Sequence, residues 1–246
     1  RPTAPTTKAP TAPTTKAPTK ALDCCTSRCR KEWSTLTQTE RNLYINGFKQ
    51  LADQGVIQEL SSTHRISAQH GQSNSYFLPW HRVFTQLLED AIRGLGDDYK
   101  CFAMPYWDWS SEATPKEVYD GAELMIMNSG LGIDSNGECQ NSGCPFDQGS
   151  YESESPSHYD NEGTKCMIRD LDYTSGHTGF GYCWFETPDE LLGIIGDSSD
   201  YGIFSGELHN DPHAYPHICV GGNMGTFYSP DDPIFYLHHA FIDYIW

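Results

Sequence analysis

Histidines are the residues whose type and spacing most clearly predict chemistry in this sequence. Of the ten histidines, eight fall into two clusters. The first cluster comprises His64, His70 and His81, and the second comprises His209, His213, His217, His238 and His239. A single histidine on an apolar face is usually a core residue, whereas two clusters of at least three indicate metal binding.

The side chains in these clusters restrict the kind of metal. Groups built from imidazoles alone suit copper, zinc, iron or nickel, and they lack the carboxylate of the facial triad found in iron oxygenases. Two sites with three histidines each would hold two metal ions. The sequence therefore predicts a centre with two metals.

The second cluster allows more than one choice of ligands. The pairs His209–His213 and His213–His217 both have the i,i+4 spacing that places two side chains on one face of a helix. Periodicity therefore leaves both pairs open.

The elements that must position these histidines are predicted to be helices. Apolar residues recur at helical spacing over residues 30–60, after a capping-box pattern at Thr37 and Glu40, so we expect His64 near the end of this helix. Further helical signals follow His81 up to Gly94, and cover residues 188–195 and 233–246. Residues 110–165 are rich in Gly, Ser, Asn, Asp and Glu, which predicts loops.

Charge and hydropathy exclude two classes of partner. The net charge is −17 and the isoelectric point is near 4.8, so the chain does not supply the Lys and Arg that nucleic acids require. No stretch approaches the length of an apolar membrane span. We expect a processed, soluble protein with neither kind of partner.

Cysteine content indicates the compartment. The nine cysteines include no CxxC pair, which favours disulfides and a secreted, extracellular protein. Cys139 and Cys144 are expected to tie the long loops together. Because the number is odd, at least one cysteine must be free or bound outside this chain.

The N-terminal segment has a composition of its own. Residues 2–21 contain PTAPTTKA twice and then a shortened PTKA, with nothing apolar enough to build a core. We expect a disordered tail over residues 1–21, either a plain spacer or an extended adhesive stalk, and a folded domain over residues 22–246.

Three strings carry a resemblance to a known family. They are FLPWHRVFTQLLE at residues 77–89, MPYWDW at residues 104–109 and DPIFYLHHAFID at residues 232–243. Together they resemble the copper signatures of the type-3 copper proteins, which include tyrosinases, catechol oxidases and molluscan haemocyanins. The resemblance covers roughly residues 30–246. It implies a mainly α-helical fold in which a four-helix core holds two copper ions, and a final helix that continues beyond Trp246.

The resemblance also implies a set of metal ligands. Those of the first copper would be His64, His70 and His81, and those of the second would be His213, His217 and His239. Gly221–Gly222 select His217 as the second ligand of its copper, and the DPxF spacing selects His239. His209 stays open as an alternative first ligand.

Residues around these ligands carry further implications. Phe235 resembles the ring that packs beside the copper pair. Asp243 is a candidate to orient a ligand or Arg82. Ala68 stands where some relatives have the cysteine of a thioether, so none is expected at His70.

The activity implied by the resemblance is oxidation of phenols by O2 to o-quinones. Substrates would be o-diphenols, and tyrosine or DOPA in proteins are further candidates. Ala214 stands where relatives that hydroxylate monophenols have Asn, so we expect faster oxidation of diphenols. With His209 as first ligand, Asn210 would restore that amide, and Asp200, Glu190 or Glu207 could otherwise hold the deprotonating water.

Two other functions stay open. The first is a catalytically weak protein of an extracellular matrix or adhesive, with matrix proteins as partners, which the repetitive tail favours. The second is a haemocyanin-like oxygen binder.

Overall fold

The protein is mainly α-helical, as predicted. A computed structural model describes residues 24–71, 74–112, 167, 169 and 185–246, and the only β-type pairing within them is a bridge between Glu32 and Tyr106. The helices are α1 (Cys24–Ser27), α2 (Gln38–Asp53), α3 (Val56–Gly71), α4 (Phe77–Arg93), α5 (Pro188–Asp197), α6 (Tyr201–His209), α7 (Asp211–Val220) and α8 (Pro233–Ile245).

The first predicted helical region is two helices. The capping box of Thr37 and Glu40 starts α2 as expected, but Gly55, with φ of +80°, separates α2 from α3. Glycine adopts this left-handed conformation without steric cost. Because α3 then continues to Gly71, His64 lies within that helix, and the expectation that it stands near a helix end is wrong.

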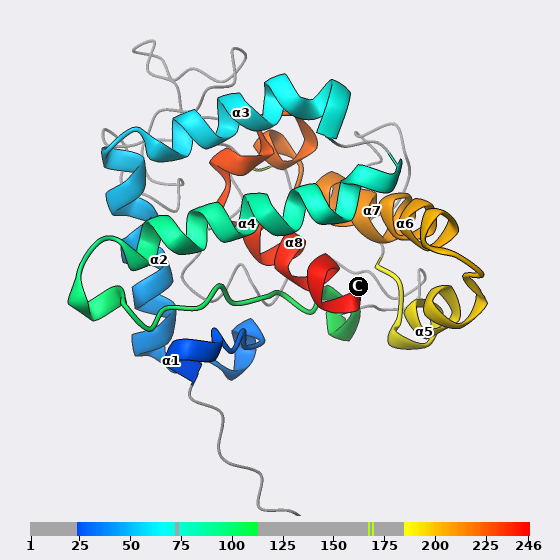
Figure 1. Ribbon diagram of the computed structural model, residues 1–246, viewed down its shortest axis with the longest axis horizontal. Coiled ribbons are helices and arrows are strands. Elements are labelled where there is room, and N and C mark those ends of the chain that lie inside the picture. Colours follow the sequence, from blue (N-terminus) through cyan, green and yellow to red (C-terminus); the bar gives the residue numbers. More distant parts are fainter. Residues whose placement is uncertain (1–23, 72–73, 113–166, 168, 170–184) are drawn as a thin grey trace, which may run out of the picture.

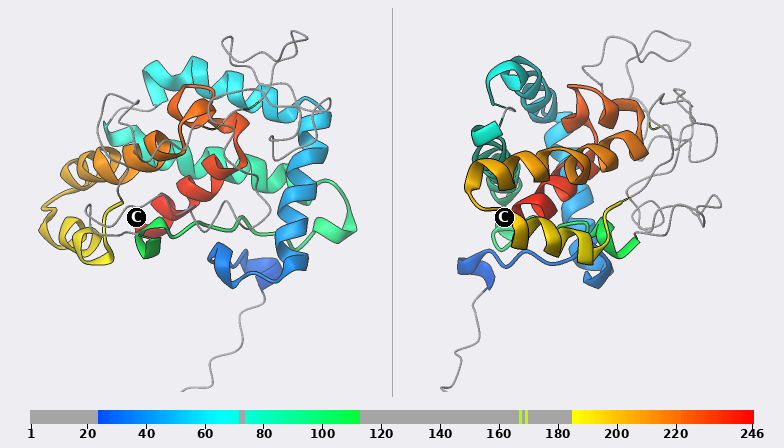
Figure 2. Two further views of the ribbon diagram at one scale, coloured as in Figure 1. Left: turned by 180° about the vertical axis from the view of Figure 1, so that it is seen from behind. Right: turned by 90° about the vertical axis from the view of Figure 1, so that its right-hand side faces the viewer.

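Helices α4 and α8 pack against each other at the centre of the molecule, with α3 and α2 around them (Figure 1). The opposite view shows α6 and α7 beside the same pair (Figure 2). Aromatic rings fill the contact: Phe84 of α4 stacks on Tyr236 of α8 with centroids 6.0 Å apart, and Phe48 of α2 meets Tyr236 edge-on. This core holds in place the helices that carry the predicted ligands.

A buried ion pair fixes the beginning of α8. Arg169 donates two hydrogen bonds to Asp232, at 2.6 and 2.7 Å, and both side chains are fully buried. The Asp232 carboxylate also accepts from the backbone N–H of Ile234, so it caps the helix. Tyr44 of α2 donates to the carbonyl of Pro233 at 2.6 Å. The first turn of α8 is therefore held from several sides.

A second group of charges joins the other end of α8 to α4 and to the N-terminal segment. Arg82 and Arg30 both pair with Asp243. The buried Glu89 pairs with Arg28 and Arg30, and it accepts the backbone N–H of Met104. Of the two partners expected for Asp243, a metal ligand or Arg82, the structure shows the ion pair with Arg82.

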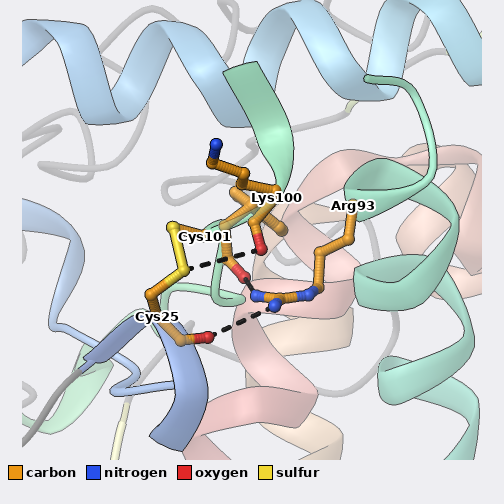
Figure 3. The surroundings of a disulfide bond; sticks show 5 residues. Cys25, Arg93, Lys100 and Cys101 are labelled. Atoms are coloured by element: carbon orange, nitrogen blue, oxygen red, sulfur yellow. Dashed lines mark hydrogen bonds between the residues drawn. A yellow bond between two sulfur atoms is a disulfide. The ribbon is translucent and has the colours of Figure 1, made fainter. Parts of the chain in front are cut away.

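A disulfide attaches α1 to the loop after α4. Cys25 and Cys101 are bonded, and Arg93 donates to the carbonyl of Cys25 at 3.2 Å beside them (Figure 3). The 76-residue separation predicts about 4.5 kcal/mol of stabilisation from the loss of unfolded-chain entropy. Cys29 and Cys219 each take part in a further disulfide.

Some predictions fall on other parts of the chain. The tail of residues 1–21, the loops of residues 113–165 with Cys139 and Cys144, and therefore the domain boundary at residue 22 lie outside the described residues. Within the described helices, none is both long and apolar enough to cross a membrane.

The buried pair of Arg169 and Asp232 generates a stability prediction. R169M leaves the Asp232 carboxylate buried without its cation, so we expect a loss of about 3 to 5 kcal/mol in the free energy of unfolding in urea. R65M, at an exposed position, is the control and should change it by less than about 1 kcal/mol. Equal losses in the two variants would contradict the importance of the pair, and R169M/D232N should recover part of the loss.

Candidate metal centre

Four histidine side chains from α7 and α8 converge. His213, His217, His238 and His239 each place a ring nitrogen within 4.8 Å of those of the others. Three of them belong to the ligand set expected for the second copper. His238 was not in that set, although its position next to His239 was the sequence signal for it.

The first predicted cluster faces the second. His81 of α4 stacks on His239 of α8 with ring centroids 4.1 Å apart, and His64 of α3 lies 5.8 Å from His81. The contact between α4 and α8 thus brings together histidines that are far apart in sequence. The backbone of His70 lies in the last turn of α3, and its side chain lies outside the described residues.

Backbone carbonyls orient the rings. Four Nδ1 atoms form hydrogen bonds with backbone carbonyls: His64 with Phe227 at 2.8 Å, His81 with Phe77 at 2.9 Å, His213 with His209 at 3.2 Å and His217 with Met224 at 2.7 Å. A carbonyl oxygen can only accept, so each Nδ1 carries the proton. In a neutral imidazole this leaves the Nε2 lone pair available, and such hydrogen bonds are typical of metal-binding histidines.

The neighbours His238 and His239 differ from these four histidines in the hydrogen bonding of Nδ1. Trp109 donates its indole N–H to Nδ1 of His238 at 3.1 Å, so the proton of neutral His238 sits on Nε2. His239 has its Nε2 only 3.3 Å from Nε2 of His217, and its Nδ1 has no hydrogen-bond partner in the described part of the chain. The Trp109 donor thus disfavours Nε2 of His238 as a ligand atom, whereas nothing in the described residues holds the proton of His239 on its Nε2.

Burial keeps these imidazoles neutral. It lowers the pKa of His64 and of His217 to about 4, against weaker opposing effects of their backbone hydrogen bonds. Burial also lowers the pKa values of His81, His213 and His239 well below the ordinary range. Because metal binding requires the unprotonated ring, the site is prepared for metal at neutral pH.

A helix break bears on the choice between His209 and His213. Helix α6 ends at His209 and α7 begins at Asp211, with Pro212 in its first turn, so these two histidines do not share one continuous helix. His213 and His217 both lie on α7. The His209 ring is 5.3 Å from that of His213, but its nitrogens are not among the four that converge. The arrangement favours His213.

Aromatic side chains surround the histidines. Phe235 lies 4.2 Å from the ring of His239 and 5.1 Å from that of His64, between the two groups. Phe77 contacts His81 and His213 at 4.9 and 4.7 Å. Neutral imidazoles in a water-poor aromatic shell, with no carboxylate in the four-residue cluster, fit copper.

Comparison with known proteins gives the family. Residues 12–246 match the family described as the common central domain of tyrosinase, and the chain belongs to the tyrosinase family of type-3 copper proteins. That domain implies a dinuclear copper centre, with which the histidine cluster is compatible.

Individual relatives agree with this assignment. The chain is 29% identical to a putative tyrosinase-like protein of Caenorhabditis elegans over 88% of its own length, but over only 30% of that protein. It is 26% identical to a tyrosinase of Streptomyces glaucescens, over 88% of its own length and 80% of that enzyme. A tyrosinase of Streptomyces antibioticus is 25% identical, with 88% and 81% covered.

The choice of first ligand on the second metal can be tested with two variants. H213A removes a nitrogen that faces His217 and His239, so we expect about half of the bound copper to be lost by elemental analysis. H209A removes a ring outside the converging group and should keep the full copper content. Loss of copper in H209A with full retention in H213A would show that His209 is the ligand.

Proposed function

We propose that the protein oxidises phenols, above all o-diphenols, to o-quinones with O2 at a dinuclear copper centre. Membership of the tyrosinase family supports copper-dependent phenol oxidation at the family level. The observation that carries the proposal for this chain is the stacking of His81 on His239, which joins two histidine groups in one aromatic core.

The proposed ligands are the six histidines named from the sequence. Those of one copper are His64, His70 and His81, and those of the other are His213, His217 and His239. When bound, the two ions would supply the exchange of two electrons between a diphenol and O2. The chain itself positions the ligand nitrogens through the hydrogen bonds between Nδ1 atoms and backbone carbonyls. It also surrounds them with aromatic rings that exclude water.

An open pocket, called the cavity below, reaches the proposed centre at His213. It has a volume of about 570 Å³ and is lined by Glu186, Ile194, Glu207, His209, Asn210, Asp211, Pro212, His213 and Ala214. Its size suits a small aromatic molecule. A phenol that enters here meets His213 directly, so the cavity is the proposed route of the substrate.

The same cavity bears on whether monophenols react. Ala214 lines it beside His213 and supplies no polar group. Asp200 and Glu190 already accept backbone N–H groups as helix caps. Of the candidates named from the sequence, Glu207 and Asn210 line the cavity and could hold a deprotonating water. We therefore propose diphenol oxidation as the main activity and tyrosine hydroxylation as the slower one.

We also propose that the protein acts outside the cell. The disulfides of Cys25, Cys101, Cys29 and Cys219 are typical of oxidising compartments. Phenolic groups of matrix or adhesive proteins would then be within reach as substrates or partners.

The activity is tested with copper-loaded protein and 4-methylcatechol. We expect quinone absorbance to rise while O2 is consumed, one molecule for every two catechols, and L-tyrosine to react about tenfold or more slowly. The copper-depleted protein is the control. Full copper content without quinone or O2 consumption would favour a matrix or adhesive role, and reversible O2 uptake without quinone would favour an oxygen binder.

A further inference from the structure

The walls of the cavity beside His213 carry an unbalanced negative charge. Three carboxylates line it, from Glu186, Glu207 and Asp211. Among the described residues that line it, none is Lys or Arg. The sequence as a whole has a net charge of −17, so the long-range field adds to the local one.

Glu186 is the most unusual of these carboxylates. The residue is only 9% exposed, and its Oε2 has no hydrogen-bond partner within the described parts of the chain. Burial raises its pKa to about 7, and the nearby Asp211 and Glu190 add to the effect. A buried carboxylate normally has a cation or several donors around it, because an unpaired charge is costly to bury.

No structural role in the described residues accounts for this arrangement. The neighbouring Glu190 completes the capping box of α5 with Thr187, so the cap does not need Glu186. A ligand with a positive charge would stabilise the ionised form of Glu186 and offset the charge of Asp211. A ligand with a carboxylate would be repelled.

We propose that this cavity selects phenols that carry an ammonium group, that is, amine-bearing catechols, over phenols that carry a carboxylate. The inference rests on the proposed phenol oxidation and names its substrate class. The aromatic ring lies toward His213, and the ammonium group lies against Glu186 and Asp211. Glu186 and Asp211 are binding residues in this scheme and take no part in electron transfer.

The size of the effect follows from electrostatics. A unit charge a few ångströms from a carboxylate at a protein surface changes binding by about tenfold or more, and salt weakens the effect. We therefore expect kcat/KM to be about tenfold higher for dopamine than for 3,4-dihydroxyphenylacetate, mainly through KM. The preference should fall as salt is raised.

The decisive variants remove charge without changing shape. E186Q and D211N should each lower the ratio of kcat/KM for dopamine to that for 3,4-dihydroxyphenylacetate by about threefold or more. E59Q removes the same charge from an exposed position on α3 and should leave the ratio unchanged. If E59Q lowers the ratio as much as E186Q does, the preference comes from net charge and the inference is wrong.

A binding measurement gives a second readout. Phenethylamine and 3-phenylpropionate have no phenolic oxygen and differ mainly in charge, and calorimetry of the copper-loaded protein should show tighter binding of the amine. E186Q should weaken the amine selectively. Equal binding of both compounds by the unmodified protein would overturn the inference.

The neutral substrate 4-methylcatechol tests the proposed phenol oxidation separately from the proposed charge selection. If it is oxidised while dopamine and 3,4-dihydroxyphenylacetate react with equal kcat/KM, the charge selection is wrong and phenol oxidation stands. If the copper-loaded protein oxidises none of the three, the proposed function fails, and calorimetry alone then decides whether the cavity prefers cations.

Discussion

The structure depends on the packing of α4 against α8, because this contact sets His81 on His239. The two rings stack with centroids 4.1 Å apart although 158 positions separate them in the numbering. Apolar packing of Phe84 on Tyr236 maintains the contact along the helices. Charged groups secure both ends of α8: Asp232 pairs with Arg169 at its start, and Asp243 pairs with Arg82 and Arg30 near its end. A shift of one helix along the other would separate the histidine groups.

This packing buries many polar nitrogens, which is unfavourable unless they find partners. Backbone carbonyls satisfy the Nδ1 atoms of His64, His81, His213 and His217. Nδ1 of His239 has no partner among the described residues, and its Nε2 lies 3.3 Å from Nε2 of His217. Metal binding would replace this contact between two imidazoles with coordination of both nitrogens. Folding and metal binding are therefore expected to be coupled, since the buried neutral rings are the form that binds metal.

Local signals predicted much of this arrangement. The capping box at Thr37, the helix after His81 and the start of α8 at the DPxF string all depend on neighbouring residues. The sequence did not reveal that α3 continues past His64, or that a helix ends at His209. In both places the apolar periodicity is similar before and after the histidine. The tautomer of His238 depends on Trp109, which is 129 positions away. The buried position of Glu186 depends equally on tertiary packing, and its local pattern is only that of a helix start.

The central claim is that two copper ions lie between the histidines of α3 and α4 and those of α7 and α8. The most direct measurement is anomalous diffraction at the copper absorption edge from crystals of the copper-loaded protein. The account predicts two peaks per chain about 3.5 to 4 Å apart. One should lie beside His64 and His81, and the other beside His213, His217 and His239. A single peak, or a second peak away from these rings, would contradict the account.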